Sequence, residues 1–335
     1  MAPSARSAAV LVATTALLAA LATGCGKDAD PMADGTVRVA TSTAALASLA
    51  ANVAGPHARV TSVVPEGHDA HTYEPSRAAK RTLASADLVL LNGLGLDEPV
   101  EDAARDAKRS GVDIVKLGDD AVDDKDLVYD RTYPEDGDRP NPHVWLDPEV
   151  AKAYVDKVAD EMSSLDGDHE ADYRKNAKAL VAKIDALDKA ARTSTKTIPK
   201  ARRRVLAYHD AVPYLARRYG LRTLPAVQPS DLRTLTAKQA TAARKAVTKA
   251  KVPAAFGAVE FPDERFEKAV TDQGLTYAAL RDDDLPGAAN EPGHSWLGLV
   301  QYDLVTLVQS LGGNPTPLQA VDTNDVGPTK ATYPQ

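Results

Sequence analysis

The sequence predicts an α/β fold of two similar halves with a long helix between them. In both halves, short β-branched or Leu-rich runs alternate with Ala-rich or amphipathic segments, which is the spacing of βαβ units and a parallel sheet. Between the halves, an apolar seam from Tyr173 to Ala191 keeps alternating steps of four and three residues. The seam predicts a helix from about Ala171 to Thr195, roughly 37 Å long. A chain of 335 residues also exceeds what one small core usually organises.

The first 25 residues read as a lipoprotein signal peptide and are set aside from the fold. Arg6 supplies a positive start, Ala8–Ala22 is apolar, and Cys25 is the only cysteine of the chain. Cys25 stands where a bacterial lipoprotein signal is cut and its thiol receives the lipid. An ordinary secretory signal with an incidental cysteine is the alternative. Residues 26–35, which are polar and contain Gly, Pro and Asp, are predicted to be a flexible tether.

Composition excludes several classes of partner and site. With Cys25 lipidated, the mature chain has no thiol for a disulfide or for cysteine-based metal binding. A soft metal must therefore be held by imidazole and carboxylate groups. The formal net charge is −7, which argues against nucleic acid because phosphates require a basic surface.

Residues 36–165 are predicted to form the N-terminal lobe. Its strands are expected at Val37–Thr41, Val60–Val64, Leu88–Leu91 and Ile114–Leu117. Its helices are expected at Ala44–Val53, Arg77–Ala86 and Pro99–Ser110, with Ser76 as the N-cap of the second. The acidic stretch Asp119–Arg139 is predicted to be a solvated loop. Asp147 and Pro148 open a further helix to about Ser163.

The remaining chain divides into a linking helix, a second lobe and a tail. The linking helix lies within residues 166–198, the C-terminal α/β lobe in 199–313, and a loose tail in 314–335. Strands of the C-terminal lobe are expected at Val205–Ala207, Thr223–Val227, Ala254–Val259 and Thr276–Leu280. Thr236 and Gln239 form a capping box, and the last helix is expected at about Ser295–Leu311.

Four polar residues follow predicted strands or precede helices, far apart in the sequence: His71, His143, His209 and an Asp of the run 282–284. Ligands bind at the carboxyl ends of parallel strands, so these side chains are predicted to converge on one metal ion. Three imidazoles and a carboxylate suit tetrahedral Zn²⁺, whereas Mg²⁺ and Ca²⁺ prefer oxygen shells. Spacing alone does not choose among the three aspartates.

Other polar residues have a plainer interpretation. Four further histidines are expected to be solvated or hydrogen-bonded rather than ligands: His57, His68, His169 and His294. Asp69 is expected to accept an imidazole N–H. Glu74 is expected to cap or orient its neighbours. Glu260 is expected to hydrogen-bond across the cleft.

Several motifs carry a resemblance to a known family. They are Gly67–Ser76, Asn92–Leu96, Asn141–Pro148, Tyr208–Ala211 and Val259–Pro262. With them the chain resembles the metal-binding lipoproteins that serve bacterial ABC importers of zinc and manganese, the zinc-uptake branch in particular. The resemblance covers nearly all of the mature chain. It implies two lobes of parallel sheet, each flanked by helices, joined by one long rigid helix, with the metal site in the interlobe cleft.

The resemblance also implies the ligand positions. The first three fall on His71, His143 and His209, the third being His in zinc-type members and Glu in several manganese-type ones. The fourth is an Asp, which alignment on Leu285 places at Asp283. That turn is a poor copy of the family's pattern, which leaves Asp282 and Asp284 open, and Ala70 replaces the usual Pro before the first ligand.

The function implied is capture without catalysis. A monomer anchored by lipid to the outer face of the cytoplasmic membrane would bind Zn²⁺ as its transported ligand, with high affinity. It would deliver the ion to an ABC permease that works with a cytoplasmic ATPase. The alternatives are a manganese importer subunit, an adhesin-like surface lipoprotein, and a secreted zinc hydrolase with Glu260 as base. No HExxH motif supports the hydrolase.

Overall fold

A computed structural model of the chain describes residues 36–129, 139–229, 234–282, 284–289, 291 and 293–334. The predicted signal peptide, the tether and Cys25 lie outside the described residues, as do residues 130–138 of the acidic stretch. Residues 37–335 belong to one folded unit. None of the described helices combines the length and the apolar run needed to cross a bilayer.

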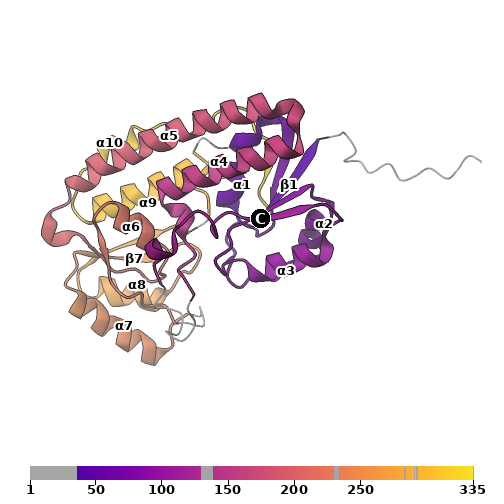
Figure 1. The fold of residues 1–335 in the computed structure, drawn as a ribbon. Helices are drawn as coiled ribbons and strands as arrows, with labels where there is room; N and C mark the ends of the chain where they lie inside the picture. Colours follow the sequence, from indigo (N-terminus) through magenta and orange to yellow (C-terminus); the bar gives the residue numbers. More distant parts are fainter. Residues whose placement is uncertain are drawn as a thin grey trace, which may run out of the picture. The chain divides into compact units, whose positions relative to one another are not determined.

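The N-terminal lobe contains an all-parallel sheet, in agreement with the predicted βαβ alternation. Its strands lie in the order β4-β3-β1-β2-β9 (Figure 1). Their bounds are β1 Val37–Thr41, β2 Ala58–Ser62, β3 Leu88–Leu91, β4 Asp113–Lys116 and β9 Ala331–Thr332. The connecting helices are α1 Ala44–Ala54, α2 Arg77–Ser85 and α3 Glu98–Ala107. Every residue of β3 is buried, as expected of a parallel strand covered on both faces.

The prediction of a loose tail over residues 314–335 was wrong. The segment forms α10 (Thr316–Gln319) and the strand β9, which pairs in parallel with β2. The amide of Glu66 donates to the carbonyl of Pro334 at 3.0 Å. A strand of two residues carries no readable period, so only its partner strand reveals it. The chain therefore returns to the N-terminal lobe at its end.

Two antiparallel neighbours, α4 (Pro148–Leu165) and α5 (Glu170–Lys196), connect the lobes. Asp147 caps α4 by accepting from the amide of Glu149. α5 has 27 residues, or about 40 Å, and its buried face is the predicted seam: Tyr173, Ala177, Leu180, Ile184, Leu187 and Ala191. α5 packs against α1, α4, α9 and α10 (Figure 1), which confirms the long linking helix.

The C-terminal lobe repeats the parallel arrangement with shorter strands. β5 (Arg204–Val205) pairs with β6 (Arg222–Thr223), and β7 (Ala254–Ala258) pairs with β8 (Thr276–Leu280). A parallel bridge from Ala207 to Phe256 connects the two pairs. The helices are α6 Pro213–Arg218, α7 Ala237–Ala250, α8 Glu264–Thr271 and α9 Trp296–Ser310. The predicted capping box at Thr236 is present. Short 3-10 turns are η1 Gly55–His57, η2 Asp124–Asp126, η4 Val144–Leu146, η5 Gly167–His169 and η6 Lys200–Arg202.

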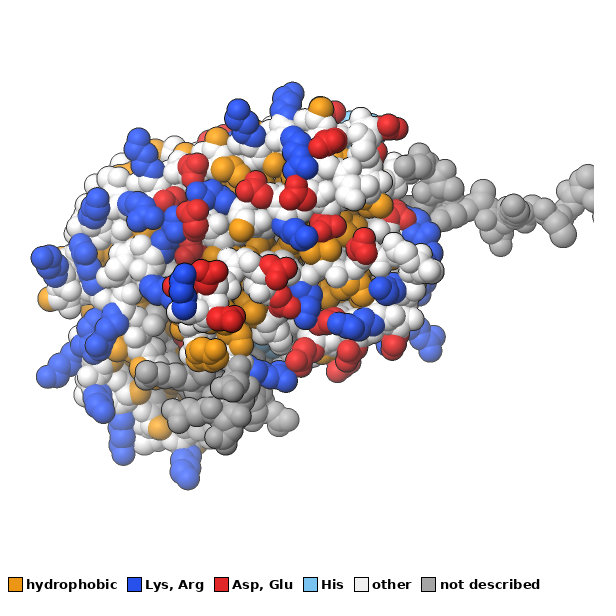
Figure 2. Space-filling model, viewed as in Figure 1, with side chains coloured by type: hydrophobic (Ala, Val, Ile, Leu, Met, Phe, Trp, Pro, Cys, Tyr) orange, Lys and Arg blue, Asp and Glu red, His pale blue; other side chains and the backbone are white. Residues whose placement is uncertain are grey.

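One apolar core extends through both lobes. It contains Val39 and Leu90 of the first sheet, Ile184 of α5, Leu304 of α9 and Phe256 of β7. A smaller cluster lies under α7 and α8. On the face drawn in Figure 2, acidic and basic side chains are interspersed and no continuous basic stripe crosses it. The loops at the carboxyl ends of the strands are therefore held by a shared core.

Candidate metal centre

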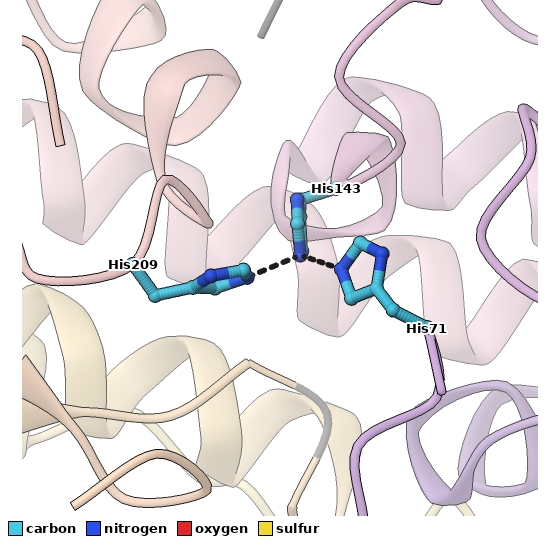
Figure 3. A group of neighbouring side chains, drawn as sticks. All are labelled: His71, His143 and His209. Atoms are coloured by element: carbon cyan, nitrogen blue, oxygen red, sulfur yellow. Dashed lines mark hydrogen bonds between the residues drawn. The ribbon is translucent and has the colours of Figure 1, made fainter. Parts of the chain in front are cut away.

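Three imidazoles from three separate loops point toward one another (Figure 3). His71 lies in the loop after β2, His143 directly precedes η4, and His209 follows the bridge that extends β5. Their candidate ligand atoms all lie within 4.8 Å of one another. Nε2 of His143 is 3.3 Å from Nε2 of His71 and 3.1 Å from Nε2 of His209. The structure thus brings the three predicted histidines together, and their role as ligands stays a prediction.

The turn before His71 is held by Asp69. One carboxylate oxygen accepts from the amide of His71 at 2.8 Å, and the other accepts from the hydroxyl of Thr72 at 2.6 Å. This local hydrogen bonding is the usual role of Asp in turns. The structure thus gives Asp69 a role in the turn, and its role as acceptor of an imidazole N–H stays a prediction.

Two amide side chains fix the orientation of the buried imidazoles. Oδ1 of Asn141 lies 3.0 Å from Nδ1 of His143 and also accepts from the His143 amide. Oε1 of Gln228 lies 2.5 Å from Nδ1 of His209. An amide oxygen only accepts, so Nδ1 carries the proton in both rings and the lone pair of Nε2 faces the centre. The sequence signal for these supports was weak: Asn141 precedes His143 by two residues, and Gln228 follows a predicted strand.

We expect Gln228→Leu to weaken metal binding by about 10- to 100-fold, the usual effect of removing the hydrogen-bond partner of a metal-binding histidine. Leu keeps the volume of the side chain but leaves Nδ1 of His209 without its acceptor, so the ring loses its fixed tautomer. Calorimetric titration with Zn²⁺ measures the effect. Gln239→Leu, at the exposed capping box of α7, is the control and should bind as the wild type does. Equal affinities for all three proteins would contradict the role given to Gln228.

The imidazoles are kept neutral by their surroundings. Burial, and then the charge that His209 would carry, lower the pKa of His71 to about 3. Burial lowers the pKa of His143 well below its usual value, with His209 and His71 adding to the effect. Neutral imidazole is the form that binds metal. The site is therefore ready for a cation without first releasing protons from these two rings.

These lowered pKa values predict that the metal-free protein loses stability as the pH falls below 6.5. The unfolded chain binds a proton at His71 from about pH 6.5 downward, whereas the folded chain leaves it neutral to about pH 3. Proton binding therefore favours unfolding, by about 2 kcal/mol from this residue between pH 7.5 and pH 5. Urea denaturation at the two pH values should show that His71→Asn removes this part of the pH dependence. The exposed His68→Asn should not, and equal pH dependence in all three proteins would contradict the assignment.

The three aspartates after β8 have different surroundings. Asp283 lies outside the described residues. Oδ2 of Asp282 is 3.5 Å from Nε2 of His209, and Asp282 lines the same cavity as His71 and His143. Oδ1 of Asp284 instead accepts from the amide of Gly67 at 2.7 Å. Among the described aspartates of this turn, Asp282 is the one that faces the histidines.

Two buried carboxylates, and the indole of Trp145 through the carbonyl of Asp282, hold this turn. Oε1 of Glu260 accepts from the amides of Asp282 and Asp284 at 3.0 and 3.3 Å. Oδ1 of Asp303, within α9, accepts from the amide of Arg281 at 2.9 Å. Burial raises the pKa of both Glu260 and Asp303 well above the usual value, and for Glu260 the charges of Asp282 and Asp284 add to the effect. Glu260 is thus a structural acceptor, but these bonds lie within the C-terminal lobe and do not cross the cleft as was predicted. Sequence reasoning missed Asp303.

The cavity at the centre is small and has an apolar rim. It measures about 10 Å³ and is lined by Leu96, Trp145 and Phe261 besides the polar groups. That space is about the volume of one water-sized sphere. It suits a single ion and has no room for an organic substrate.

Two of the remaining histidines follow the plainer interpretation. His57 pairs with Asp172 at 3.0 Å, and His169 pairs with Asp166 at 2.8 Å. Their rings stack on each other, with centroids 3.9 Å apart. Both imidazoles of this cluster are therefore satisfied by hydrogen bonds to carboxylates.

Comparison with known proteins shows that this chain is similar to bacterial metal-uptake and metal-binding proteins. The family model "ZnuA: Zinc-uptake complex component A periplasmic" matches residues 39–310. The chain is 26% identical over 297 residues to the manganese-binding lipoprotein MntA of Halalkalibacterium halodurans, covering 88% of this chain and 96% of the relative. It is 33% identical over 220 residues to the manganese-binding lipoprotein MntA of Bacillus subtilis, covering 64% of this chain and 67% of the relative.

A solved structure shares the fold. The periplasmic zinc-binding protein TroA from Treponema pallidum matches with a TM-score of 0.73 at 22% identity, over 83% of this chain and 99% of that one. The match to the family model takes in all three histidines and most of both lobes. This chain therefore belongs to the family described as zinc-uptake complex component A, periplasmic (ZnuA).

Proposed function

We propose that this chain is the substrate-binding subunit of a metal ABC importer, and that it captures Zn²⁺ and delivers it to the permease. The observation that carries the proposal is the spacing of the donor atoms. Ligands of one tetrahedral zinc ion, at bonds of about 2.0 to 2.2 Å, lie about 3.3 to 3.6 Å apart. The two Nε2 pairs at 3.3 and 3.1 Å and the nitrogen–oxygen pair at 3.5 Å are close to this spacing.

We take His71, His143 and His209 as three ligands and Asp282 as the fourth. Asp282 is favoured over Asp284 because the latter accepts from Gly67. Alignment with the family favours Asp283, and substitution decides between the two. Asp282→Asn should weaken zinc binding far more than Asp283→Asn, in calorimetric titration. If Asp283→Asn weakens zinc binding more than Asp282→Asn does, Asp283 is the fourth ligand.

The donor set supports zinc over manganese. Three neutral imidazole nitrogens and one carboxylate suit Zn²⁺, which also binds nitrogen ligands more tightly than Mn²⁺ in the general affinity order. Several relatives are named for manganese, the two MntA proteins among them, so a manganese importer subunit is the alternative. A small site with His209 in the third position offers Mn²⁺ fewer of the oxygen ligands that it prefers.

The chain is a binding protein and not an enzyme, in keeping with the family to which it belongs. A zinc hydrolase keeps one coordination position open for water and has a place for its substrate. Four protein ligands would fill a tetrahedral shell, and the cavity of about 10 Å³ excludes an organic substrate. Oε1 of Glu260, the candidate base named for a hydrolase, already accepts from the amides of Asp282 and Asp284.

Titration of the metal-free chain starting at Gly26 tests the proposal. We expect one tightly bound zinc per chain at the histidine centre and much weaker binding of Mn²⁺ in competition. Tight manganese binding with weak zinc binding would favour the manganese importer. If neither ion gives any heat of binding, the histidine centre is not a metal site and the proposal is wrong.

We further propose that Cys25 is lipidated and anchors the chain to the outer face of the cytoplasmic membrane. Relatives from two bacteria are named as lipoproteins, and Cys25 ends a segment typical of a lipoprotein signal. The proposed ligands all come from one chain, so a monomer suffices for binding. In cell fractionation, Cys25→Ser should move the protein from the membrane fraction to the soluble or secreted fraction. A variant that stays in the membrane fraction would contradict the anchor.

A further inference from the structure

A second cavity lies beside the loop that carries His71, and the metal centre does not use it. It measures about 260 Å³, and its lining includes Glu291, His294, Asp325 and Tyr333. His294 comes from the segment before α9, whereas Asp325 and Tyr333 come from the C-terminal segment that returns to the N-terminal sheet. The cavity therefore forms where these two segments meet.

The imidazole of His294 is buried in the wall of this cavity and makes no hydrogen bond with the described residues. Its side chain is only 2% exposed, and neither Nδ1 nor Nε2 has a hydrogen-bond partner among the described residues. The ring of Tyr333 packs edge-on against it, with centroids 4.8 Å apart. A buried polar group without a partner costs about 1 to 3 kcal/mol, and most such groups in proteins are satisfied. The two nitrogens are therefore available to a ligand at the wall of this cavity.

A carboxylate lies next to the imidazole at a distance typical of shared coordination. Nε2 of His294 is 3.5 Å from Oε1 of Glu66. This distance is long for a hydrogen bond, but two ligands of one tetrahedral ion lie about 3.3 to 3.6 Å apart. The same 3.5 Å separates His209 and Asp282 at the first centre. Glu66 and His294 are thus spaced as a histidine–carboxylate pair that holds a metal ion.

The charge of the surroundings favours a cation. Glu291 and Asp325 are acidic side chains of the lining, which includes no Lys or Arg among the described residues, and Glu66 lies outside that lining, next to His294. Besides burial, the charges of Asp325 and Glu66 raise the pKa of the Tyr333 hydroxyl. A concave surface of one sign concentrates ions of the opposite sign. An anionic ligand such as phosphate would be repelled.

We infer that His294 and Glu66 hold a second divalent cation, independent of the histidine centre and more weakly bound. Two protein ligands do not complete a coordination shell, so water must supply the remaining positions. Imidazole with carboxylate suits Zn²⁺ and its neighbours Co²⁺ and Ni²⁺ rather than Ca²⁺. The second site lies five residues along the chain from His71, since Glu66 belongs to the same loop.

Imidazole NMR during a metal titration tests this inference directly. The mature chain is first given one equivalent of Zn²⁺, and a second cation, Zn²⁺ or paramagnetic Co²⁺, is then added. We expect the resonances of His294 to shift or broaden during the second addition, with a dissociation constant at least tenfold weaker than that of the first equivalent. His294→Ala, which also assigns the resonances, should abolish the second equivalent. Glu66→Gln, which keeps the shape of the side chain, should weaken it at least tenfold.

His68→Ala is the matched control, because His68 is an exposed histidine of the same loop, and it should leave both equivalents in place. Loss of the second equivalent in His68→Ala, or its persistence in both His294→Ala and Glu66→Gln, would overturn the inference. Unchanged His294 resonances at millimolar metal would do the same and would leave His294 as a core residue. The result does not depend on the first site, because the His294 resonances decide it even if the first equivalent fails to bind.

Discussion

Replacement of His143 by alanine is expected to weaken zinc binding by more than 100-fold. His143 is the middle imidazole, with its Nε2 at 3.3 Å from that of His71 and 3.1 Å from that of His209. Loss of a ligand should exceed the 10- to 100-fold effect typical of residues that only support a ligand. Competition against a chelator of known zinc affinity measures the change over this range.

The fold of the His143→Ala variant is the necessary control, since His143 is 1% exposed and borders the buried core. Circular dichroism and thermal unfolding of the metal-free proteins should show a folded variant. His68→Ala, which alters an exposed histidine of the loop that carries His71, should bind zinc as the wild type does. A folded His143→Ala protein with wild-type affinity would show that the ion binds elsewhere.

The sequence predicted the parts of this fold that depend on local patterns. β1, β3 and β8 were predicted at their observed bounds, and the seam from Tyr173 to Ala191 predicted the buried face of α5. Caps were equally readable, because a cap involves residues only two or three positions apart. The convergence of the three histidines was predictable because ligands bind at the carboxyl ends of parallel strands, and the strand ends of two facing sheets can meet in one cleft.

What could not be predicted depends on contacts between distant segments. Asp303 accepts from Arg281 across 22 positions, and its only sequence signal is an acidic residue within an apolar helix. Gln228 reaches His209 across 19 positions. β9 exists only because β2 offers it an edge. The isolation of His294 from hydrogen-bond partners is likewise a property of packing, since its sequence neighbours give no sign of it.

Trp145 connects the histidine centre to the turn after β8. Its replacement is expected to lower both the free energy of unfolding and the affinity for zinc, and a matched variant can show which loss comes from the hydrogen bond to the turn. Its indole N–H donates to the carbonyl of Asp282 at 2.9 Å, and its own carbonyl accepts from the indole of Trp296 at 3.0 Å. Trp145→Ala should cost about 3 to 5 kcal/mol of unfolding free energy, as is usual for a buried aromatic side chain. Trp145→Phe keeps most of the volume and removes the hydrogen bond to the turn.

We expect Trp145→Phe to lower zinc affinity by about 10- to 100-fold, because the carbonyl of Asp282 loses its donor and the turn is free to rotate its carboxylate away from His209. Trp296→Phe is the matched control: both indoles are 1% exposed, and each donates to a backbone carbonyl, but Trp296 does not bond the turn. Urea denaturation of the metal-free variants should show similar losses of stability, about 1 to 3 kcal/mol each. Zinc titration should then distinguish the two variants, because only Trp145→Phe is expected to bind zinc more weakly. If both variants lose affinity equally, the effect comes from general loosening of the core and not from the hydrogen bond to Asp282.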